Sequence, residues 1–529
     1  MCGINGYISK SFIGNEKINN IMHRGPDDRN LMTFEKKDYK ILLSFFRLAI
    51  IDIKNGMQPF IYKNEKINRE VYLLCNGEIY NYKKIIKDFG LNTESDCKVI
   101  LDLYLKIGIE DTVKELDGEF AFVLLDITED NFNIYFCRDR FGIRPLFYEY
   151  NETGFYFSSE LKGLSSKNGK HVEPRHVYHI NLYTNELEKF SYYTIEKKYD
   201  IFDTYENLLE KVKNTLIDSV KLRMISERQI GCLLSGGLDS SLMAGIASRI
   251  LKTEGKRLTT FSIGMDYDSP DIEYARKVAK YINSIHHEII IPVEKWIENL
   301  PNLIKQIETY DITTIRATSA QYLLGKWISE NTDIKVLLNG DGSDEICAGY
   351  IYFYNAPDEI ESHLENIRLL NEIHLYDVLR VDRGISAHGL EARVPFLSAD
   401  FVDLYLSIDK NLRNPIKNQR IEKYLLRNAF LKENIIPYEV LMRKKEAFSD
   451  GISSYKKSWF EYIKEYVETQ VSDEEYEKNC IEKFPSKEAY WYKKIYDENY
   501  KLHDIKISYW MPKWCEINNE PSARVLKDY

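Results

Sequence analysis

Short apolar runs separated by polar, turn-like clusters fill the first 190 residues. The runs lie at 41–46, 71–74, 120–125 and 134–137. Runs this short between turn residues favour β-strands. One stretch differs, because Val99, Leu103 and Ile107 recur every four residues within 96–107, which predicts an amphipathic helix. The pattern indicates a β-rich N-terminal domain over residues 2–190.

The pattern changes near residue 205. Apolar runs at 230–234, 258–264, 288–291 and 335–338 are expected to be strands, and they alternate with helical patterns at 208–224, 241–251 and from 269 onwards. Strands that alternate with helices of this length indicate βαβ units and a parallel sheet. Beyond about 360 the chain is predicted to be mainly helical. A second domain, of the α/β class, is therefore expected over 205–529.

Polar clusters at 165–170 and 196–200 are the candidate boundaries between the two domains. No Gly/Ser-rich linker separates the halves, so the junction is expected to be packed.

Composition narrows the classes of protein. The chain has 529 residues, a net charge of -10 and a pI of about 5.7, which argues against a nucleic-acid partner. No basic leader precedes an apolar stretch and no window approaches 18 apolar residues, so neither a secretory signal nor a membrane helix is expected. The eight cysteines form no C-x-x-C pair and are expected to be reduced thiols of a cytoplasmic protein.

Cys2 directly follows the initiator Met1. Removal of Met1 would give Cys2 a free α-amine beside its thiol, with ordinary pKa values of about 7.7–8.0 and about 8.5. The amine could then accept the thiol proton, which would make Cys2 an N-terminal nucleophile. Most second-position cysteines have no such role, so this interpretation needs support from other residues.

That support comes from five segments in a fixed order, at 1–4, 23–27, 47–52, 76–81 and 95–97, which together closely resemble the class II glutamine amidotransferases. The resemblance implies an α+β domain of the N-terminal-nucleophile type, with an antiparallel β-sandwich flanked by helices. It implies that Cys2 attacks the side-chain amide of glutamine and that Asn76 and Gly77 form the oxyanion hole. The residues that it implies for glutamine binding are Arg47, Ile51, Asn76, Gly77, Glu78 and Asp96.

The physical chemistry of these residue types agrees with the resemblance. A planar guanidinium suits a carboxylate, and an amide side chain with a backbone N–H suits a developing oxyanion. Taken alone, Asp96 is better interpreted as a helix N-cap and Arg47 as part of a surface ion pair.

A second group of residues lies between the predicted strand 230–234 and the helix that follows. The loop reads Ser235-Gly236-Gly237-Leu238-Asp239-Ser240. Small residues at a helix N-terminus let backbone N–H groups approach a phosphate, although many strand–helix turns share this feature. No Walker A sequence occurs. The loop resembles the pyrophosphate loop of the N-type ATP pyrophosphatases, and the segment 338–345 supports that resemblance.

Asp239 and Asp344 follow two predicted strands, where their carboxylates would suit Mg²⁺ held through a pyrophosphate. Either residue alone would be interpreted as a turn or capping residue.

Over nearly its whole length the chain resembles the glutamine-hydrolysing asparagine synthetases, in their eukaryote-like form. The further matching segments are 308–317, 389–397, 443–451, 509–514 and 521–524. The resemblance implies that aspartate, glutamine and ATP give asparagine, glutamate, AMP and pyrophosphate through β-aspartyl-AMP, with ammonia passing through an internal tunnel. It also implies a homodimer, and it makes 443–451 the candidate closing loop.

The resemblance assigns roles within the second domain. Asp341 is linked to formation of the intermediate, and Lys445 neutralises the transferring phosphoryl group. The ATP-binding residues that it implies are Leu234, Ser235, Gly236, Gly237, Asp239, Ser240, Ile263, Asn339 and Gly340. The family pattern usually has Ser and Glu where this chain has Asn339 and Asp341, and Asp where it has Ser398.

Two other classes of function stay open. The chain could be a related ATP-dependent ligase that amidates another acid or closes a β-lactam, or a regulatory homologue without turnover. The β-lactam-forming relatives generally lack the N-terminal cysteine, so Cys2 counts against that branch. The combination of Cys2 with the phosphate loop favours the synthetase.

Overall fold

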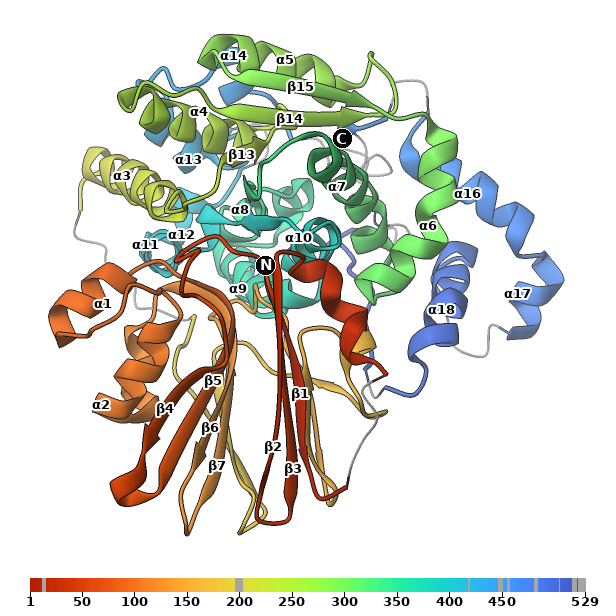
Figure 1. Ribbon diagram of the computed structural model, residues 1–529. Helices are drawn as coiled ribbons and strands as arrows, with labels where there is room; N and C mark the ends of the chain where they lie inside the picture. Colours follow the sequence, from red (N-terminus) through yellow and green to blue (C-terminus); the bar gives the residue numbers. More distant parts are fainter. Residues whose placement is uncertain are drawn as a thin grey trace.

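The computed structural model describes residues 1–11, 16–195, 203–416, 419–445, 451–453, 457–479, 484–503, 505–515 and 521. The predicted boundary at 196–200, Cys480, most of the predicted closing loop (446–450) and residues 522–524 lie outside this description. The N-terminal half is a sandwich of two antiparallel sheets, and the C-terminal half contains a parallel sheet covered by helices (Figure 1).

The first sheet of the sandwich has six strands in the order β10-β8-β9-β1-β3-β2. Its strands are β1 (Gly3–Ser9), β2 (Asp28–Lys36), β3 (Tyr39–Arg47), β8 (Phe147–Asn151), β9 (Gly154–Ser158) and β10 (Lys170–His171). The second sheet also has six strands, in the order β12-β11-β7-β6-β5-β4. Its strands are β4 (Phe60–Asn64), β5 (Arg69–Ile79), β6 (Gly118–Ile127), β7 (Phe132–Arg138), β11 (His176–Asn181) and β12 (Glu186–Ser191).

Side chains from both sheets interdigitate between them, as the alternation of a sandwich requires. Phe136 of β7 lies within 4.9 Å, centroid to centroid, of the rings of Tyr148, Phe155 and Tyr178. The outer face of the second sheet packs on α1 (Tyr82–Phe89) and α2 (Lys98–Glu115).

The predicted helix at 96–107 is α2, with shifted limits. It starts at Lys98 and continues to Glu115 across a break at Gly108, which has φ 76°. The predicted boundary cluster at 165–170 lies inside the sandwich, because Lys170 and His171 pair with β8.

The parallel sheet has five strands in the order β15-β14-β13-β16-β17. They are β13 (Ile230–Leu233), β14 (Thr259–Gly264), β15 (Ile285–Ile290), β16 (Val336–Leu338) and β17 (Glu391–Arg393). The first four match the predicted strands. The fifth lies in a region predicted to be mainly helical, because a three-residue strand has too little alternation for sequence periodicity to reveal.

Helices cover both faces of this sheet. Because parallel crossovers are right-handed, the helices between β13 and β15 lie on one face, and those that lead back to β16 lie on the other. Within the described ranges, the α-helices of this half are α3 (Tyr205–Arg223), α4 (Leu238–Thr253), α5 (Pro270–Ile282), α6 (Val293–Ile307), α7 (Ile312–Asn331), α8 (Ser343–Ile346), α9 (Glu359–Glu372), α10 (Asp377–Ser386), α11 (Ala399–Ser407), α12 (Lys410–Arg413), α13 (Tyr424–Phe430), α14 (Tyr438–Leu441), α16 (Trp459–Gln470), α17 (Asp473–Asn479) and α18 (Lys487–Tyr500).

Short 3₁₀ helices complete the described elements. They are η1 (Ile18–Arg24), η2 (Glu65–Ile67), η3 (Leu161–Gly163), η4 (Ile351–Asn355), η5 (Ile373–Leu375) and η6 (Pro395–Leu397). No helix within the described ranges combines the length and the apolar composition that crossing a membrane requires. The seven cysteines in those ranges are all free thiols.

Truncation of the aromatic core between the two sheets tests this architecture. Phe136→Ala should lower the free energy of opening of the sandwich by about 3–5 kcal/mol, because it removes a fully buried ring and leaves a cavity. Hydrogen–deuterium exchange of the β7 and β11 amides measures that opening locally. Leu187→Ala, at an exposed position on β12, should change it by less than about 0.5 kcal/mol. Equal effects of the two variants would contradict the packing.

Candidate active sites

Strand register places Cys2 at the same end of the first sheet as Arg47. Gly3 of β1 pairs with Phe46 of β3, so the residues beyond them are neighbours. The backbone N–H of Leu48 donates to Cys2 Sγ at 3.4 Å. Burial raises the pKa of the Cys2 thiol to about 12, so in the chain that retains Met1 this thiol is neutral. The α-amine of Met1 lies 3.7 Å from the Glu391 carboxylate, at the junction of the two halves (Figure 1).

The amide of Asn76 is ready for a ligand. Asn76 is fully buried near the end of β5, and within the described part of the chain neither its Nδ2 nor its Oδ1 has a hydrogen-bond partner. An unsatisfied buried polar group costs about 1–3 kcal/mol, so a free amide here is typical of a binding position. Next to it, Gly77 has φ 156°, and a Cβ there would lie 2.2 Å from the Glu119 carbonyl oxygen. Both residues are therefore held by close strand packing.

Arg47 and Asp96 supply opposite charges in this part of the sandwich. Arg47 is buried at the end of β3 and donates to the carbonyl oxygens of Asp52 and Ile53 at 2.6 and 3.0 Å. Asp96 does not cap α2, whose N-cap is Cys97. Its carboxylate instead accepts the Ile79 N–H at 3.1 Å, and burial raises its pKa to about 6.

The other two residues predicted to bind glutamine lie beside these. Ile51 is buried in the loop after β3, and Glu78 follows Gly77 on β5. Glu78 forms an ion pair at 3.4 Å with Arg393 of the C-terminal half. Burial raises the pKa of Glu78 well above its usual range, with further contributions from Glu391 and Asp96.

A cavity opens at the carboxyl ends of β13, β14 and β16. Ligands of open α/β sheets bind at this edge. Eleven of the residues predicted for the second site line the cavity: Leu234, Ser235, Gly237, Asp239, Ser240, Ile263, Asn339, Gly340, Asp341, Asp344 and Lys445. Gly236 lies behind the loop with φ 74°, where a Cβ would be 2.5 Å from the Ala275 nitrogen.

The loop after β13 is held by its own hydroxyl groups. The Ser235 N–H donates to Ser240 Oγ at 3.2 Å, and the two hydroxyls lie 3.0 Å apart. Helix α4 starts at Leu238, three residues before the predicted position, with Gly237 as its N-cap. Asp239 and Ser240 therefore belong to its first turn, and the positive end of the helix faces the cavity.

Two carboxylates and two ammonium groups meet on one wall of the cavity. Lys423 Nζ lies 2.6 Å from Asp239 and 2.7 Å from Asp344, and Lys445 Nζ lies 2.6 Å from the other oxygen of Asp344. Burial alone would raise the pKa of Asp344, but the two lysines lower it below its usual range. Lys423 was absent from the sequence prediction, since a single lysine in a helical region carries no signal.

Asp341 is held by residues that the sequence prediction also missed. Arg380 of α10 forms an ion pair with Asp341, and Gln321 of α7 donates to the same carboxylate at 3.2 Å. Arg380 also pairs with Asp377 one turn earlier, at 2.7 Å. From sequence alone, that spacing of three residues indicates an ordinary surface pair on a helix.

The other two departures from the family pattern have structural explanations. The Nδ2 of Asn339 is buried with no hydrogen-bond partner within the described residues, and the side chain borders the cavity. Ser398 is the N-cap of α11 and accepts the Phe401 N–H, a role that Ser and Asp perform about equally well.

The fold and the two sites together define a class of protein. A sandwich that carries Cys2 and a buried, unpaired Asn76 amide is joined to a parallel sheet with a phosphate-type loop at its ligand-binding edge. This is the arrangement of an amidotransferase domain joined to a nucleotide-using domain.

Comparison with known proteins identifies the family. Residues 1–201 match the family described as "Glutamine amidotransferase domain", and residues 211–368 and 358–518 match "Asparagine synthase". The asparagine synthetases [glutamine-hydrolyzing] of Gallus gallus and Homo sapiens are each 44% identical to this chain, and that of Mus musculus is 45% identical. Each alignment covers 96% of this chain and 95% of the relative. The chain belongs to the glutamine-hydrolysing asparagine synthetase family.

The raised pKa of Asp96 has a consequence for stability. A carboxyl group with a pKa of about 6 when folded and about 3.9 when unfolded destabilises the fold as pH rises through that interval. Asp96→Asn should therefore stabilise the ligand-free protein at pH 7 by about 2–3 kcal/mol, and the gain should vanish near pH 4. Urea midpoints of both proteins, measured from pH 7 to pH 4, test this expectation. A difference that does not depend on pH would contradict it.

Proposed function

We propose that this chain is a glutamine-dependent asparagine synthetase. It converts aspartate, glutamine, ATP and water to asparagine, glutamate, AMP and pyrophosphate. The observation that carries the proposal is the presence in one chain of Cys2 and an unpaired, buried Asn76 amide in the sandwich and of a phosphate-type cavity lined by Asp239 and Asp344. The sequence identity of 44–45% to asparagine synthetases over almost the whole chain supports this proposal.

The first half-reaction takes place in the sandwich. Once Met1 is removed, the α-amine of Cys2 accepts the thiol proton and Sγ attacks the side-chain amide of glutamine. The Asn76 amide and the Gly77 N–H stabilise the oxyanion that develops. Arg47 binds the α-carboxylate of glutamine and Asp96 binds its ammonium group, whose charge favours the ionised form of Asp96.

The second half-reaction takes place in the cavity of the parallel sheet. The loop 235–240 and the first turn of α4 bind the phosphates, and Asn339 and Gly340 border the nucleotide. Lys445 neutralises negative charge that develops on the phosphoryl group as the aspartate side chain displaces pyrophosphate. Asp341, held by Arg380, lies where the acyl-adenylate forms.

The residues present fit a magnesium ion that arrives with the nucleotide. Within the described residues, no group of three or more His, Cys, Asp or Glu side chains could hold a metal ion. Asp239 and Asp344 both line the cavity and share Lys423, and Mg²⁺ commonly takes one or two protein carboxylates together with substrate phosphates. When bound, the ion would neutralise charge on the departing pyrophosphate, and these two carboxylates would hold it.

Arg393, at the end of β17, connects the two sites. The Asn339 N–H donates to the Arg393 carbonyl oxygen at 2.9 Å, and the Arg393 guanidinium pairs with Glu78 in the sandwich. This proximity supports direct transfer of ammonia between the sites. A homodimer and a cytoplasmic location complete the proposal, on family resemblance alone.

A glutamine-dependent ligase for a different acid is the alternative, since the acid pocket is inferred only from Asp341, Arg380 and Asp377. The two candidates differ in a single assay, in which purified protein receives ATP, Mg²⁺ and glutamine with either aspartate or other acids. Asparagine and AMP formed only with aspartate support the synthetase. Hydrolysis of glutamine without formation of asparagine or AMP would contradict the proposed synthetase activity.

Replacement of the nucleophile should separate the two half-reactions. Cys2→Ala should abolish asparagine formation from glutamine while ammonia-dependent formation stays close to that of the wild type, because only the thiol attacks glutamine. Mass spectrometry of asparagine, glutamate and AMP measures both reactions. Loss of both activities in a folded variant would show that Cys2 has a different role.

Replacement of Asp344 in the cavity should remove the synthetase reaction and leave glutamine hydrolysis intact. Asp344→Asn should lower asparagine formation from either nitrogen source by about 10²-fold or more, since one carboxylate for the metal and the partner of two lysines are lost. Glutamate release from glutamine should persist. Tyr438→Ala, at an exposed position away from both sites, is the control. An Asp344→Asn enzyme with full synthetase activity would refute the assignment of this site.

A further inference from the structure

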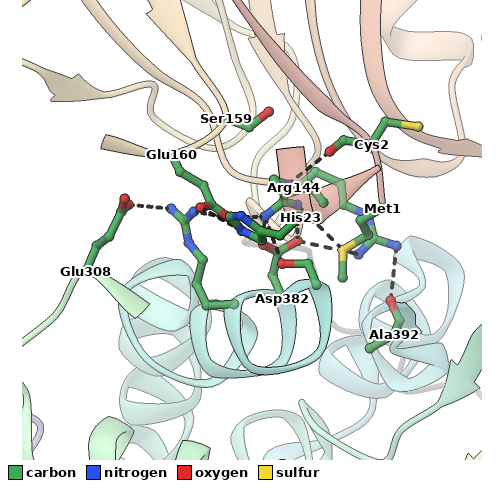
Figure 2. Close-up of polar contacts among 12 residues, drawn as sticks. Met1, Cys2, His23, Arg144, Ser159, Glu160, Glu308, Asp382 and Ala392 are labelled. Carbon is green, nitrogen blue, oxygen red and sulfur yellow. Dashed lines mark hydrogen bonds and ion pairs between the residues drawn. The ribbon is translucent and has the colours of Figure 1, made fainter. Parts of the chain in front are cut away.

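Arg24 connects the backbone of the nucleophile to a helix of the other half of the protein. Its Nε donates to the carbonyl oxygen of Cys2 at 2.9 Å. Its Nη1 and Nη2 donate to the two carboxylate oxygens of Asp382, at 2.7 and 3.0 Å. Asp382 belongs to α10, 358 residues away in the sequence. In Figure 2, Cys2 lies in the upper part of the view and Asp382 lies on the helix below it.

The contact between Arg24 and Asp382 fixes an orientation as well as a distance. Two parallel N–H···O bonds hold the planar guanidinium in one plane and leave Nε directed at Cys2. Nη1 also donates to Glu160 at 2.6 Å and to Ser386 of α10 at 3.0 Å, and Nη2 makes a longer contact of 3.8 Å with Met1 Sδ. Asp382 is therefore the residue that sets the angle of the guanidinium.

The group is buried from solvent. Arg24 is 0% exposed and Asp382 1%. Burial alone would lower the pKa of Arg24, but the charges of Asp382 and Glu160 outweigh it and raise the pKa above its usual range. Since water cannot replace either partner, a change at Asp382 has to be accommodated by movement of Arg24.

A second buried carboxylate at this junction, Glu308, is bonded to other residues. Glu308 pairs with Arg383 at 3.2 Å and accepts the N–H groups of Leu161 and Lys162, both at 2.9 Å. Glu308 is also buried and also joins the two halves, but it makes no hydrogen bond or ion pair with Arg24 or Cys2. It therefore offers a matched comparison.

We infer that Asp382, a residue of the nucleotide-using half, is a positioning residue for the N-terminal nucleophile, acting through Arg24 on the Cys2 carbonyl. The inference rests on the proposed glutaminase activity. A nucleophile displaced by about 1 Å loses about 10²-fold in rate even when substrate binding is intact. Arg47 and Asp96, which would bind glutamine, do not contact this group of residues, so the effect should appear in kcat and not in KM.

The experiment measures glutamate release from glutamine by the full-length chain. Asp382→Asn keeps the size of the side chain but loses its charge, and it should lower kcat about 10- to 100-fold while KM changes by less than about twofold. Asp382→Glu, which restores the charge, should recover part of the loss. Glu308→Gln should keep the wild-type kcat. Ammonia-dependent asparagine formation reports that each variant is folded.

Ser386→Ala gives a second test if Asp382→Asn does not fold. It removes one neutral acceptor of Arg24 and should lower kcat about two- to fivefold with unchanged KM. Wild-type kcat in a folded Asp382→Asn, an equal loss in Glu308→Gln, or a loss confined to KM would each overturn the inference. A wild-type chain that releases no glutamate would instead overturn the proposed function itself.

Discussion

Buried charge at the junction of the two halves constrains the rest of this molecule. Four arginines, Arg24, Arg144, Arg383 and Arg393, are nearly inaccessible to solvent there and pair with carboxylates of both halves. An ion taken out of water is tolerated only with a well-placed partner, and loss of one partner from such a pair costs about 3–5 kcal/mol. The halves therefore have one relative arrangement in which these charges are satisfied.

That arrangement places both sites on shared elements. Helix α10 carries Asp377 and Arg380 towards the nucleotide cavity, and Asp382, Arg383 and Ser386 towards the sandwich. At 100° per residue these two groups lie on different faces of the helix. The backbone near Asn339 is likewise bonded to Arg393, which pairs with Glu78. A small movement of α10 or of the backbone near Asn339 would therefore shift residues of both sites.

Each site is prepared for its ligand in a different way. In the sandwich, the Asn76 amide is left unsatisfied by strand packing, so its hydrogen bonds are available to a substrate. In the cavity, Lys423 forms ion pairs with both Asp239 and Asp344, which orders the two carboxylates. The shorter side chain of Asp341 is compensated by Arg380, which reaches it from α10.

The sequence alone determined the elements and the chemistry that local patterns encode. Periodicity predicted the strands β3, β5, β6, β7 and β13 to β16, and short motifs with their family resemblance singled out the phosphate loop and Cys2, Arg47, Asn76 and Asp96. The sequence did not predict β17, several short strands of the sandwich, or the roles of Lys423, Arg380 and Asp382. Their partners lie tens to hundreds of residues away, and a lone charged residue in a helix shows no sign of burial until the chain has folded. Only tertiary structure could decide those contacts, because they depend on which charges the packed halves enclose together.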